Sequence, residues 1–232
     1  MSGRSPRWIS VKTGTRVGTL PVGSTVKLNL NGTPWDWLVV NQGLPSSIYD
    51  ASCNGTWLLL KDIYSNNTWN DFNANALEIS GIHSYLNGDF LNLFDSNIKD
   101  AIKQAKIPYR KNGGSGGTTQ QGANGLPCKI FLLSAPEVHY EHSYIDSGEG
   151  AALSYFASCV TNNADPKRIA KLNGSAAYWW LRNPSTDNNS SVWGVYSDGN
   201  CGRENATIRK GIRPAIILPS NFRISADLIT YP

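Results

Sequence analysis

The chain has 232 residues, of which 40% are apolar and 16% are charged, and its formal net charge is +4. This length and apolar content suffice for one sizeable core, so we expect one compact domain. Lysine and arginine form no run longer than Lys167-Arg168 and no apolar stretch is long enough to span a bilayer, which argues against a nucleic-acid partner and against membrane insertion.

The first 23 residues are polar and basic, and Trp8 and Ile9 are the only obvious apolar anchor there. We interpret residues 1–23 as an arm or attachment segment that precedes a ligand-binding domain over residues 24–232. The opening residues lack the apolar core of a signal peptide, so we expect a chain made as a soluble protein. Abundant Asn, Ser, Thr and Gly indicate a neutral polar surface, typical of a protein exposed on a particle or outside the cell.

Strands are predicted at the start of this domain. Residues 26–30 alternate between apolar and polar side chains, Asn31-Gly32 is a strong hairpin signal, and residues 35–41 return as the second strand. Another apolar strand is predicted over residues 56–61.

Helical patterns follow. Apolar residues recur at helical spacing between residues 79 and 93, although Gly81 and Gly88 argue against one unbroken helix. Residues 95–106 have one apolar face and lysines on the other, which predicts a helix that Pro108 ends.

The middle of the chain combines a glycine-rich segment with two further predicted helices. Residues 112–125 have too few apolar side chains to offset the entropy of ordering, and we expect a mobile loop. Ser134 and Glu137 have the capping-box spacing, which predicts a helix over residues 135–144. A short apolar helix is predicted over residues 151–158.

Four more strands are predicted, over residues 129–133, 177–182, 192–197 and 211–219. Strands at both ends of the domain with helices between them predict an α+β fold whose termini lie close together in one sheet.

Few side chains are suited to catalysis or metal binding. The histidines are His83, His139 and His142, and the last two could ligate zinc together with Glu137 and Glu141 from one helix face. The zincin spacing and an identifiable third ligand are missing, so a solvated polar face is the better interpretation. Because hydrolase, phosphate-binding and dinucleotide-binding motifs are also missing, we predict no catalytic residue, no metal, no cofactor and no enzyme.

The four cysteines, Cys53, Cys128, Cys159 and Cys201, are widely separated and include no Cys-x-x-Cys pair. This spacing indicates neither a structural zinc site nor a thioredoxin-like motif. We expect free, partly buried thiols, although an even count also permits disulfides.

The last third of the chain carries the most specific motifs. They are Tyr178-Trp179-Trp180-Leu181-Arg182-Asn183-Pro184, a strand ending in Ser197-Asp198-Gly199, and Gly211-Ile212-Arg213-Pro214-Ala215. Together they resemble an uncharacterised domain family of phage tail and gut-bacterial surface proteins, over about residues 24–220. That family is similar to the C-type lectin-like and formylglycine-generating-enzyme-like folds, and it includes variable proteins of diversity-generating retroelements.

The resemblance implies a C-type lectin-like fold, with small antiparallel sheets, flanking helices and long irregular loops, and an adhesin of a phage or bacterium. In the variable proteins, a C-terminal block of residues is rewritten while flanking residues stay fixed. We therefore divide the last third into a frame and a set of ligand contacts. The frame is predicted to comprise Trp179, Trp180, Arg182, Trp193, Gly211, Arg213 and Pro214.

The predicted ligand contacts are small polar residues, charged residues and a tyrosine, a composition typical of antibody paratopes. They are Ser185, Thr186, Asp187, Asn188, Asn189, Ser190, Ser191, Tyr196, Asn200, Arg203, Glu204, Asn205 and Thr207. An ordinary polar loop between strands is the alternative interpretation of this segment.

Two pairs of frame residues have expected roles. Arg182 and Arg213 are expected to hydrogen-bond backbone carbonyls of irregular loops. Trp179 and Trp180 are neighbours on a strand and point to opposite sides, so at least one lies in the core. A sugar-stacking platform is the alternative for these two indoles.

The resemblance, together with the polar composition of the predicted contacts, implies a displayed ligand-binding or receptor-binding protein, either a phage tail adhesin or a retroelement-diversified variable protein, on a virion or a bacterial cell surface. Its expected partners are a host-cell surface protein or glycan and, through the arm, other virion or tail proteins. One alternative is a structural tail or virion component without diversified binding. Another is a formylglycine-generating-like oxidase, which needs a close cysteine pair where this chain has only Cys201.

Overall fold

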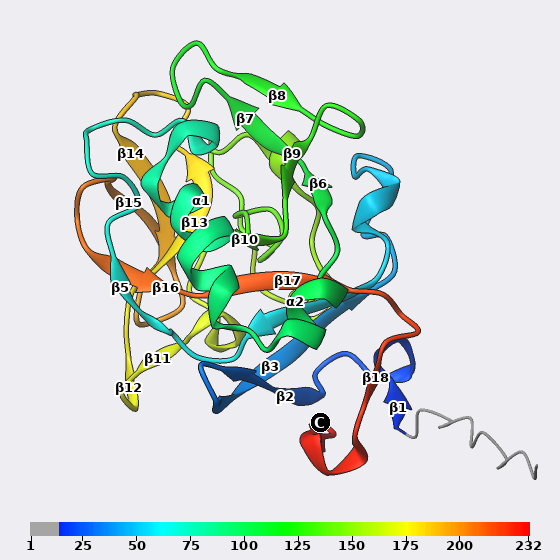
Figure 1. The fold of residues 1–232 in the computed structure, drawn as a ribbon. Coiled ribbons are helices and arrows are strands. Elements are labelled where there is room, and N and C mark those ends of the chain that lie inside the picture. Colours follow the sequence, from blue (N-terminus) through cyan, green and yellow to red (C-terminus); the bar gives the residue numbers. More distant parts are fainter. Residues whose placement is uncertain (1–13) are drawn as a thin grey trace, which may run out of the picture.

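The computed structural model describes residues 14–232 (Figure 1). Most of the predicted arm over residues 1–23, including Trp8 and Ile9, lies outside the described residues. Its last part is packed against the domain, because Val17 and Leu20 are buried in the core. Strand β1 (Thr15–Arg16) pairs with β18 (Arg223–Ile224) near the other end of the chain.

The fold is mostly β, with 35% of residues in strands and 17% in helices. The prediction of an α+β, lectin-like domain with flanking helices is therefore wrong. Within residues 14–232, no helix combines the length and apolarity needed to cross a membrane.

The larger sheet is antiparallel, and its neighbouring strands β4 (Thr56–Leu60) and β17 (Pro214–Leu218) are buried along their whole length. The predicted turn at Asn31-Gly32 connects β2 and β3, with φ of 49° at Asn31 and 75° at Gly32, as the tight hairpin requires. The sheet order is β10 (Ile130–Leu132), β17 (Pro214–Leu218), β4 (Thr56–Leu60), β3 (Thr33–Gln42), β2 (Thr25–Leu30) and β19 (Ile229–Thr230).

The second sheet carries the motifs of the last third. Its neighbouring strands are antiparallel except for the parallel pair β13 and β16. The order is β15 (Cys201–Asn205), β14 (Ser191–Val195), β13 (Trp179–Pro184), β16 (Lys210–Ile212) and β5 (Ser65–Asn67). Strand β15 is therefore an edge strand of this sheet, with four half-buried residues.

One continuous helical segment runs from Gly81 to Leu93, as the apolar spacing predicts, and neither Gly81 nor Gly88 interrupts it. It changes character along its length, from α1 (Gly81–Tyr85) through a π-helical turn η4 (Leu86–Phe90) to a 3₁₀ turn η5 (Leu91–Leu93). Ile82, Leu86 and Phe90 are its buried face, and the Ser80 hydroxyl caps it by accepting from the His83 N–H.

The remaining elements are short. The single-turn 3₁₀ segments are η1 (Val17–Thr19), η2 (Ala51–Cys53), η3 (Leu77–Ile79), η6 (Ser147–Glu149), η7 (Pro166–Arg168) and η8 (Ala226–Leu228). Small antiparallel pairs join β6 (Ala105–Ile107) to β9 (Leu126–Cys128), β7 (Tyr109–Lys111) to β8 (Thr118–Gln120), and β11 (Lys171–Leu172) to β12 (Ser175–Ala176).

Two predicted helices are shorter than expected or missing. The helix over residues 95–106 is limited to α2 (Ser96–Ala101), because the Lys103 N–H pairs with the Ile217 carbonyl and the chain then extends into β6. Residues 151–158 form turns, since the Tyr155 N–H donates to the Val40 carbonyl of β3 and not within a helix.

The predicted helix over residues 135–144 ends after one turn. Both capping-box bonds form: the Ser134 N–H donates to Glu137 Oε2 at 2.8 Å, and the Glu137 N–H donates to the Ser134 hydroxyl at 3.2 Å. The turn then closes with a Tyr140 to Ala135 backbone bond around His139, whose φ is 57°. A residue in the left-handed conformation commonly ends a helix. The capping-box bonds therefore form, but the chain does not continue as a helix.

The glycine-rich segment over residues 112–125 is packed and partly paired, in contrast to the free loop expected. It contains β8, and the Gly114 N–H donates to Asn75 Oδ1 at 2.9 Å. A Cβ added to Gly114 would lie 1.8 Å from the Asn188 carbonyl oxygen, so only glycine permits this approach to the loop between β13 and β14.

Candidate functional site

A buried arginine on β13 anchors the site. Arg182 is 0% exposed and forms a bidentate ion pair with Glu137, with Nη1 to Oε2 at 2.5 Å and Nη2 to Oε1 at 2.7 Å. The same guanidinium donates to the carbonyls of Pro108, Leu132 and Glu149. One side chain therefore fixes the backbone of three separate segments.

Glu137, the acidic partner of Arg182, accepts further hydrogen bonds. Glu137 accepts from the Ser134 N–H and from the Tyr49 hydroxyl, which lies 2.8 Å from Oε1. The capping role of Glu137 was predictable from its spacing to Ser134, but the ion pair spans 45 residues of sequence. The presence of Arg182 in a strand of mostly apolar residues was the signal that could have indicated a buried ion pair.

Two further buried arginines hold backbone carbonyls. Arg213 donates to the carbonyls of Leu60 and Lys61, both at 2.9 Å, and stacks over the Trp179 ring at 4.8 Å. Desolvation lowers the pKa of Arg213 to about 10. Arg168, which the sequence analysis did not single out, is also fully buried.

The other frame residues lie inside the protein. Trp179 and Trp180 are both 0% exposed, and their indole N–H groups donate to the carbonyls of Arg168 and Asn67. Their faces are covered, so neither indole is a platform for stacking a sugar from solvent. Trp193, Gly211 and Pro214 are buried too.

The predicted contact residues lie on the loop between β13 and β14, the first residue of β14, the turn between β14 and β15, the edge strand β15 and the turn that follows it. Asp187, Asn189, Tyr196 and Thr207 are exposed, whereas Ser185 is buried. The half-buried members are Thr186, Asn188, Ser190, Ser191, Asn200, Arg203, Glu204 and Asn205.

Two of these residues, Ser185 and Asn188, use their side chains for hydrogen bonds within the loop. Asn188 Oδ1 accepts from the N–H groups of Ser190 and Ser191, at 3.0 and 2.7 Å. The hydroxyl of buried Ser185 donates to Asp187 Oδ1 at 2.7 Å. Ser185 and Asn188 are thus positioned to hold the loop in shape.

Arg203 organises the exposed side chains. Its Nη1 lies 2.6 Å from Asp187 Oδ1 and 2.7 Å from the Ser185 hydroxyl, and its guanidinium stacks over the Tyr144 ring at 4.7 Å. Hydrogen bonds from Arg203 and Ser185 lower the pKa of Asp187 to about 2. Trp193 packs beneath this group, with its N–H donating to the Tyr144 carbonyl.

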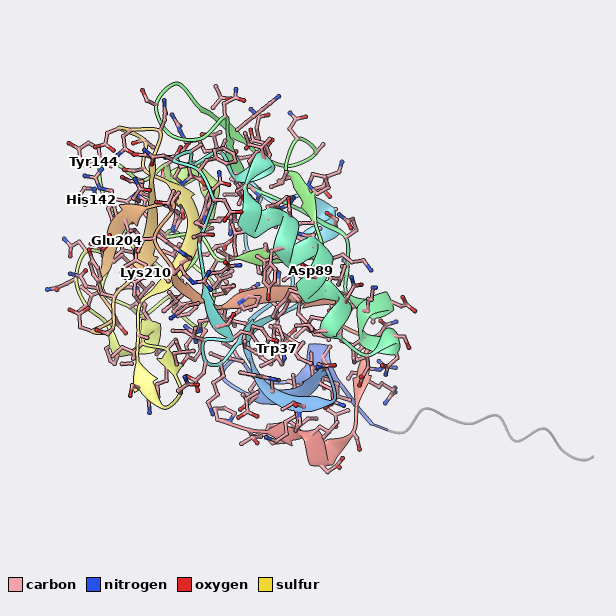
Figure 2. All side chains as sticks on the ribbon, turned by 60° about the vertical axis from the view of Figure 1, so that its left-hand side comes forward. Trp37, Asp89, His142, Tyr144, Glu204 and Lys210 are labelled. Carbon is pink, nitrogen blue, oxygen red and sulfur yellow. The ribbon has the colours of Figure 1, made fainter. Side chains whose placement is uncertain are left out.

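We call the surface around the edge strand β15 the recognition face and define it as Tyr144, Asp187, Asn189, Tyr196, Arg203 and Glu204. It includes both sides of the strand, since Arg203 points toward Tyr144 and its neighbour Glu204 points the other way, toward Lys210. Figure 2 shows Tyr144 and Glu204 on the same side of the molecule, together with His142 and Lys210. Tyr144 was missed by the sequence analysis because it falls in a segment predicted to be helical.

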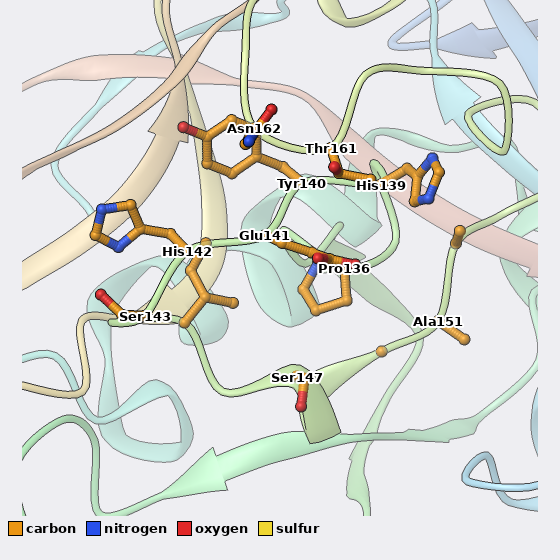
Figure 3. A pocket seen from close by; sticks show the side chains of 13 residues that line it. Pro136, His139, Tyr140, Glu141, His142, Ser143, Ser147, Ala151, Thr161 and Asn162 are labelled. Atoms are coloured by element: carbon orange, nitrogen blue, oxygen red, sulfur yellow. The ribbon is translucent and has the colours of Figure 1, made fainter.

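A cleft of about 760 Å³ adjoins the recognition face (Figure 3). His142 belongs to its lining, and the His142 ring lies 4.9 Å from the Trp193 ring and 5.3 Å from the Tyr144 ring. The walls are Pro136, His139, Tyr140, Glu141, His142, Ser143, Ile145, Ser147, Gly150, Ala151, Ala152, Thr161 and Asn162.

None of the cleft residues was predicted to contact a ligand, although His139, His142 and Glu141 were considered as zinc ligands. Glu137, the fourth candidate, points into the core toward Arg182. Over residues 14–232, no three His, Cys, Asp or Glu side chains are grouped as a metal site requires.

The four cysteines are free and buried. Burial raises the pKa of Cys201 to about 12 and that of Cys53 and Cys159 to about 11. High pKa values of this kind are typical of buried structural thiols.

The comparison with protein-family models matches residues 54–220 to a family described as Domain of unknown function (DUF6273). No curated protein and no solved structure matches the chain. The matched region contains the buried arginines, the recognition face and the cleft.

Proposed function

Because the chain belongs to DUF6273, a family of unknown function, we propose its function from the geometry of the recognition face. The protein is a displayed ligand-binding protein, and the side chains of the recognition face contact the ligand. It acts as a phage tail adhesin or a retroelement-diversified variable protein.

The observation that supports this proposal is the separation of frame and face. Arg182 and Arg213 hold backbone carbonyls of distant segments, and both are buried. These bonds do not depend on which side chains stand on the edge strand β15. Substitutions at exposed positions away from such bonds usually change stability by less than about 0.5 kcal/mol, so the face can vary while the fold persists.

The chemistry of the face also suits recognition. Tyr144 and Tyr196 are 40% and 37% exposed, and tyrosine offers large contact area with few rotatable bonds. Arg203 is already fixed by Asp187 and the Tyr144 ring, so little side-chain entropy is lost when it binds. Tyrosine and arginine are enriched among the residues that dominate binding energy.

The proposal extends to location and partner. We place the protein on a virion or bacterial cell surface, where the face meets a host-cell surface protein or glycan and the N-terminal arm meets other virion or tail proteins. Diversification by a retroelement would leave a near-identical repeat, differing mainly at adenines, beside a reverse transcriptase gene. A structural tail component would lack both that repeat and the binding described next.

Binding to intact cells tests the proposal. The full chain, fluorescently labelled, is incubated with a panel of intact gut bacteria and measured by flow cytometry. The triple variant Tyr144→Ala/Arg203→Ala/Glu204→Ala is expected to lose at least about tenfold in affinity, as loss of a central aromatic and arginine pair does in other interfaces. Its unfolding midpoint should fall by less than about 5 °C.

The matched control removes an exposed ion pair from the other sheet. Lys27 and Asp36 lie 2.8 Å apart on β2 and β3, with side chains 44% and 36% exposed. The variant Lys27→Ala/Asp36→Ala should bind cells as the unaltered chain does. Equal binding by the triple variant and the unaltered chain would contradict the proposal.

A further inference from the structure

Five polar side chains of the cleft have no hydrogen-bond partner among the described residues. The side chains of Glu141, Ser143, Ser147, Thr161 and Asn162 form no hydrogen bond or ion pair with any residue of 14–232. On the recognition face, in contrast, Asp187 and Arg203 bond one another. These five side chains therefore leave their donors and acceptors free for a ligand in the cleft.

The cleft is also held open by the fold. Arg168 donates to the carbonyl of His139 on one wall at 2.6 Å and to that of Asn163, beside the other wall, at 2.8 Å. The Glu141 N–H donates to the Thr161 carbonyl at 2.6 Å and ties the two walls together. A ligand therefore enters a formed site and does not have to order loops.

The two histidines add donors and acceptors at fixed positions. His139 adopts a φ of 57°, a conformation that non-glycine residues adopt at a cost and that concentrates at functional sites. His142 Nδ1 accepts from the Tyr144 N–H at 3.1 Å. The neutral imidazole of His142 therefore carries its proton on Nε2, where it can donate to a ligand.

The residues that line the cleft indicate the charge and size of its ligand. It contains hydroxyl, amide, imidazole and carboxylate groups but no lysine or arginine, so an anionic ligand would meet Glu141 without a compensating cation. The volume of about 760 Å³ lies in the usual range of small-molecule sites. Gly150, Ala151 and Ala152 lie in the same wall and let a ring approach the backbone closely.

We propose that this cleft is a second binding site and that its ligand is a neutral saccharide, the terminal part of an oligosaccharide. Hydroxyl groups on the ligand are both donors and acceptors and match the unpartnered side chains of the walls. Pro136 and Ile145 offer apolar surface to the C–H face of the sugar ring. The inference goes beyond the proposed function, because the cleft uses none of the recognition-face residues.

The test is binding of the full chain to an array of defined oligosaccharides. The neutral set contains hexose, 6-deoxyhexose and N-acetylhexosamine units, and the anionic set is sialylated or sulfated. At least one neutral oligosaccharide is expected to bind. The variant Ala152→Trp, which fills the cleft, should reduce its affinity at least about tenfold, and Asn162→Ala should reduce it about threefold to tenfold.

Two controls separate this result from other outcomes. Asn162 is exposed and its side chain forms no bond within the described residues, so Asn162→Ala should leave the unfolding midpoint unchanged. Glu204→Ala should leave saccharide affinity unchanged within about twofold, because the Glu204 carboxylate lies 3.8 Å from Lys210 and not in the lining of the cleft. The inference is overturned if no neutral oligosaccharide binds, if only anionic ones bind, or if folded Ala152→Trp binds as the unaltered chain does. Cell binding lost in the recognition-face variant but kept in Ala152→Trp would support the proposed function alone.

Discussion

Arg182→Met is expected to lower the free energy of unfolding by about 3–5 kcal/mol. The substitution removes the only cation bonded to Glu137 among the described residues and leaves that carboxylate buried. It also leaves the carbonyls of Pro108, Leu132 and Glu149 without their donor. Urea denaturation of the two proteins at the same pH measures the loss.

Arg203→Met is the matched control, because it removes the same side chain from the same sheet. Arg203 pairs with Asp187 at 2.6 Å, but both side chains are about a third exposed, so its loss should cost about 1 kcal/mol or less. Adding Glu137→Leu to Arg182→Met should recover part of the lost stability, since no unpaired charge then remains buried. Similar losses for Arg182→Met and Arg203→Met would show that the buried pair is not the anchor of the frame.

Glu149→Gln is expected to make the protein more stable than the unaltered chain at pH 8 and about equally stable at pH 4.5. Burial raises the pKa of Glu149 to about 8 from an ordinary value of 4.5. Arg182 and Arg110 partly offset this effect of burial on the pKa, whereas Asp146 adds to it. The folded state therefore holds a proton on this carboxyl group that the unfolded chain releases.

The direction of the pH dependence of stability follows from the difference in the pKa of Glu149 between the folded and unfolded states. Below pH 4.5 both states bind the proton, so the contribution of Glu149 to stability is fully present. Between pH 4.5 and 8 only the unfolded chain releases the proton, and stability falls by about 1.4 kcal/mol per pH unit. Urea denaturation of both proteins at pH 5, 6.5 and 8 measures the difference. A difference that stays constant over this range would contradict the buried, protonated state of Glu149.

The sequence identified the elements whose signals are local. The Asn31-Gly32 turn and the apolar spacing between residues 79 and 93 both predict structure that forms. The helix over residues 135–144 failed because the capping box at Ser134 is satisfied by a single turn. The left-handed conformation of His139 ends that turn. The residues next to His139 in the sequence do not indicate this conformation.

The candidate site was predictable only in part. Polar residues between buried strands indicated an exposed surface, but burial of Ser185 and the loop-shaping bonds of Asn188 depend on packing against β15 and the glycine-rich segment. The cleft was missed because its walls, the segment ending at Ala152 and the pair Thr161–Asn162, are brought together by Arg168. Arg168 donates to five backbone carbonyls, those of Val138, His139, Val160, Asn163 and Gly199. A single arginine in a polar stretch of sequence does not indicate such a set of partners.

The most direct test of the separation between frame and face compares two displayed libraries. In one, Asp187, Asn189, Tyr196, Glu204 and Thr207 are varied together; in the other, Trp180, Arg182, Trp193, Gly211 and Arg213 are varied in the same way. The fraction of members that resist protease is measured for each. Most members of the first library and almost none of the second are predicted to remain folded. Equal loss of folding in the two libraries would contradict the account.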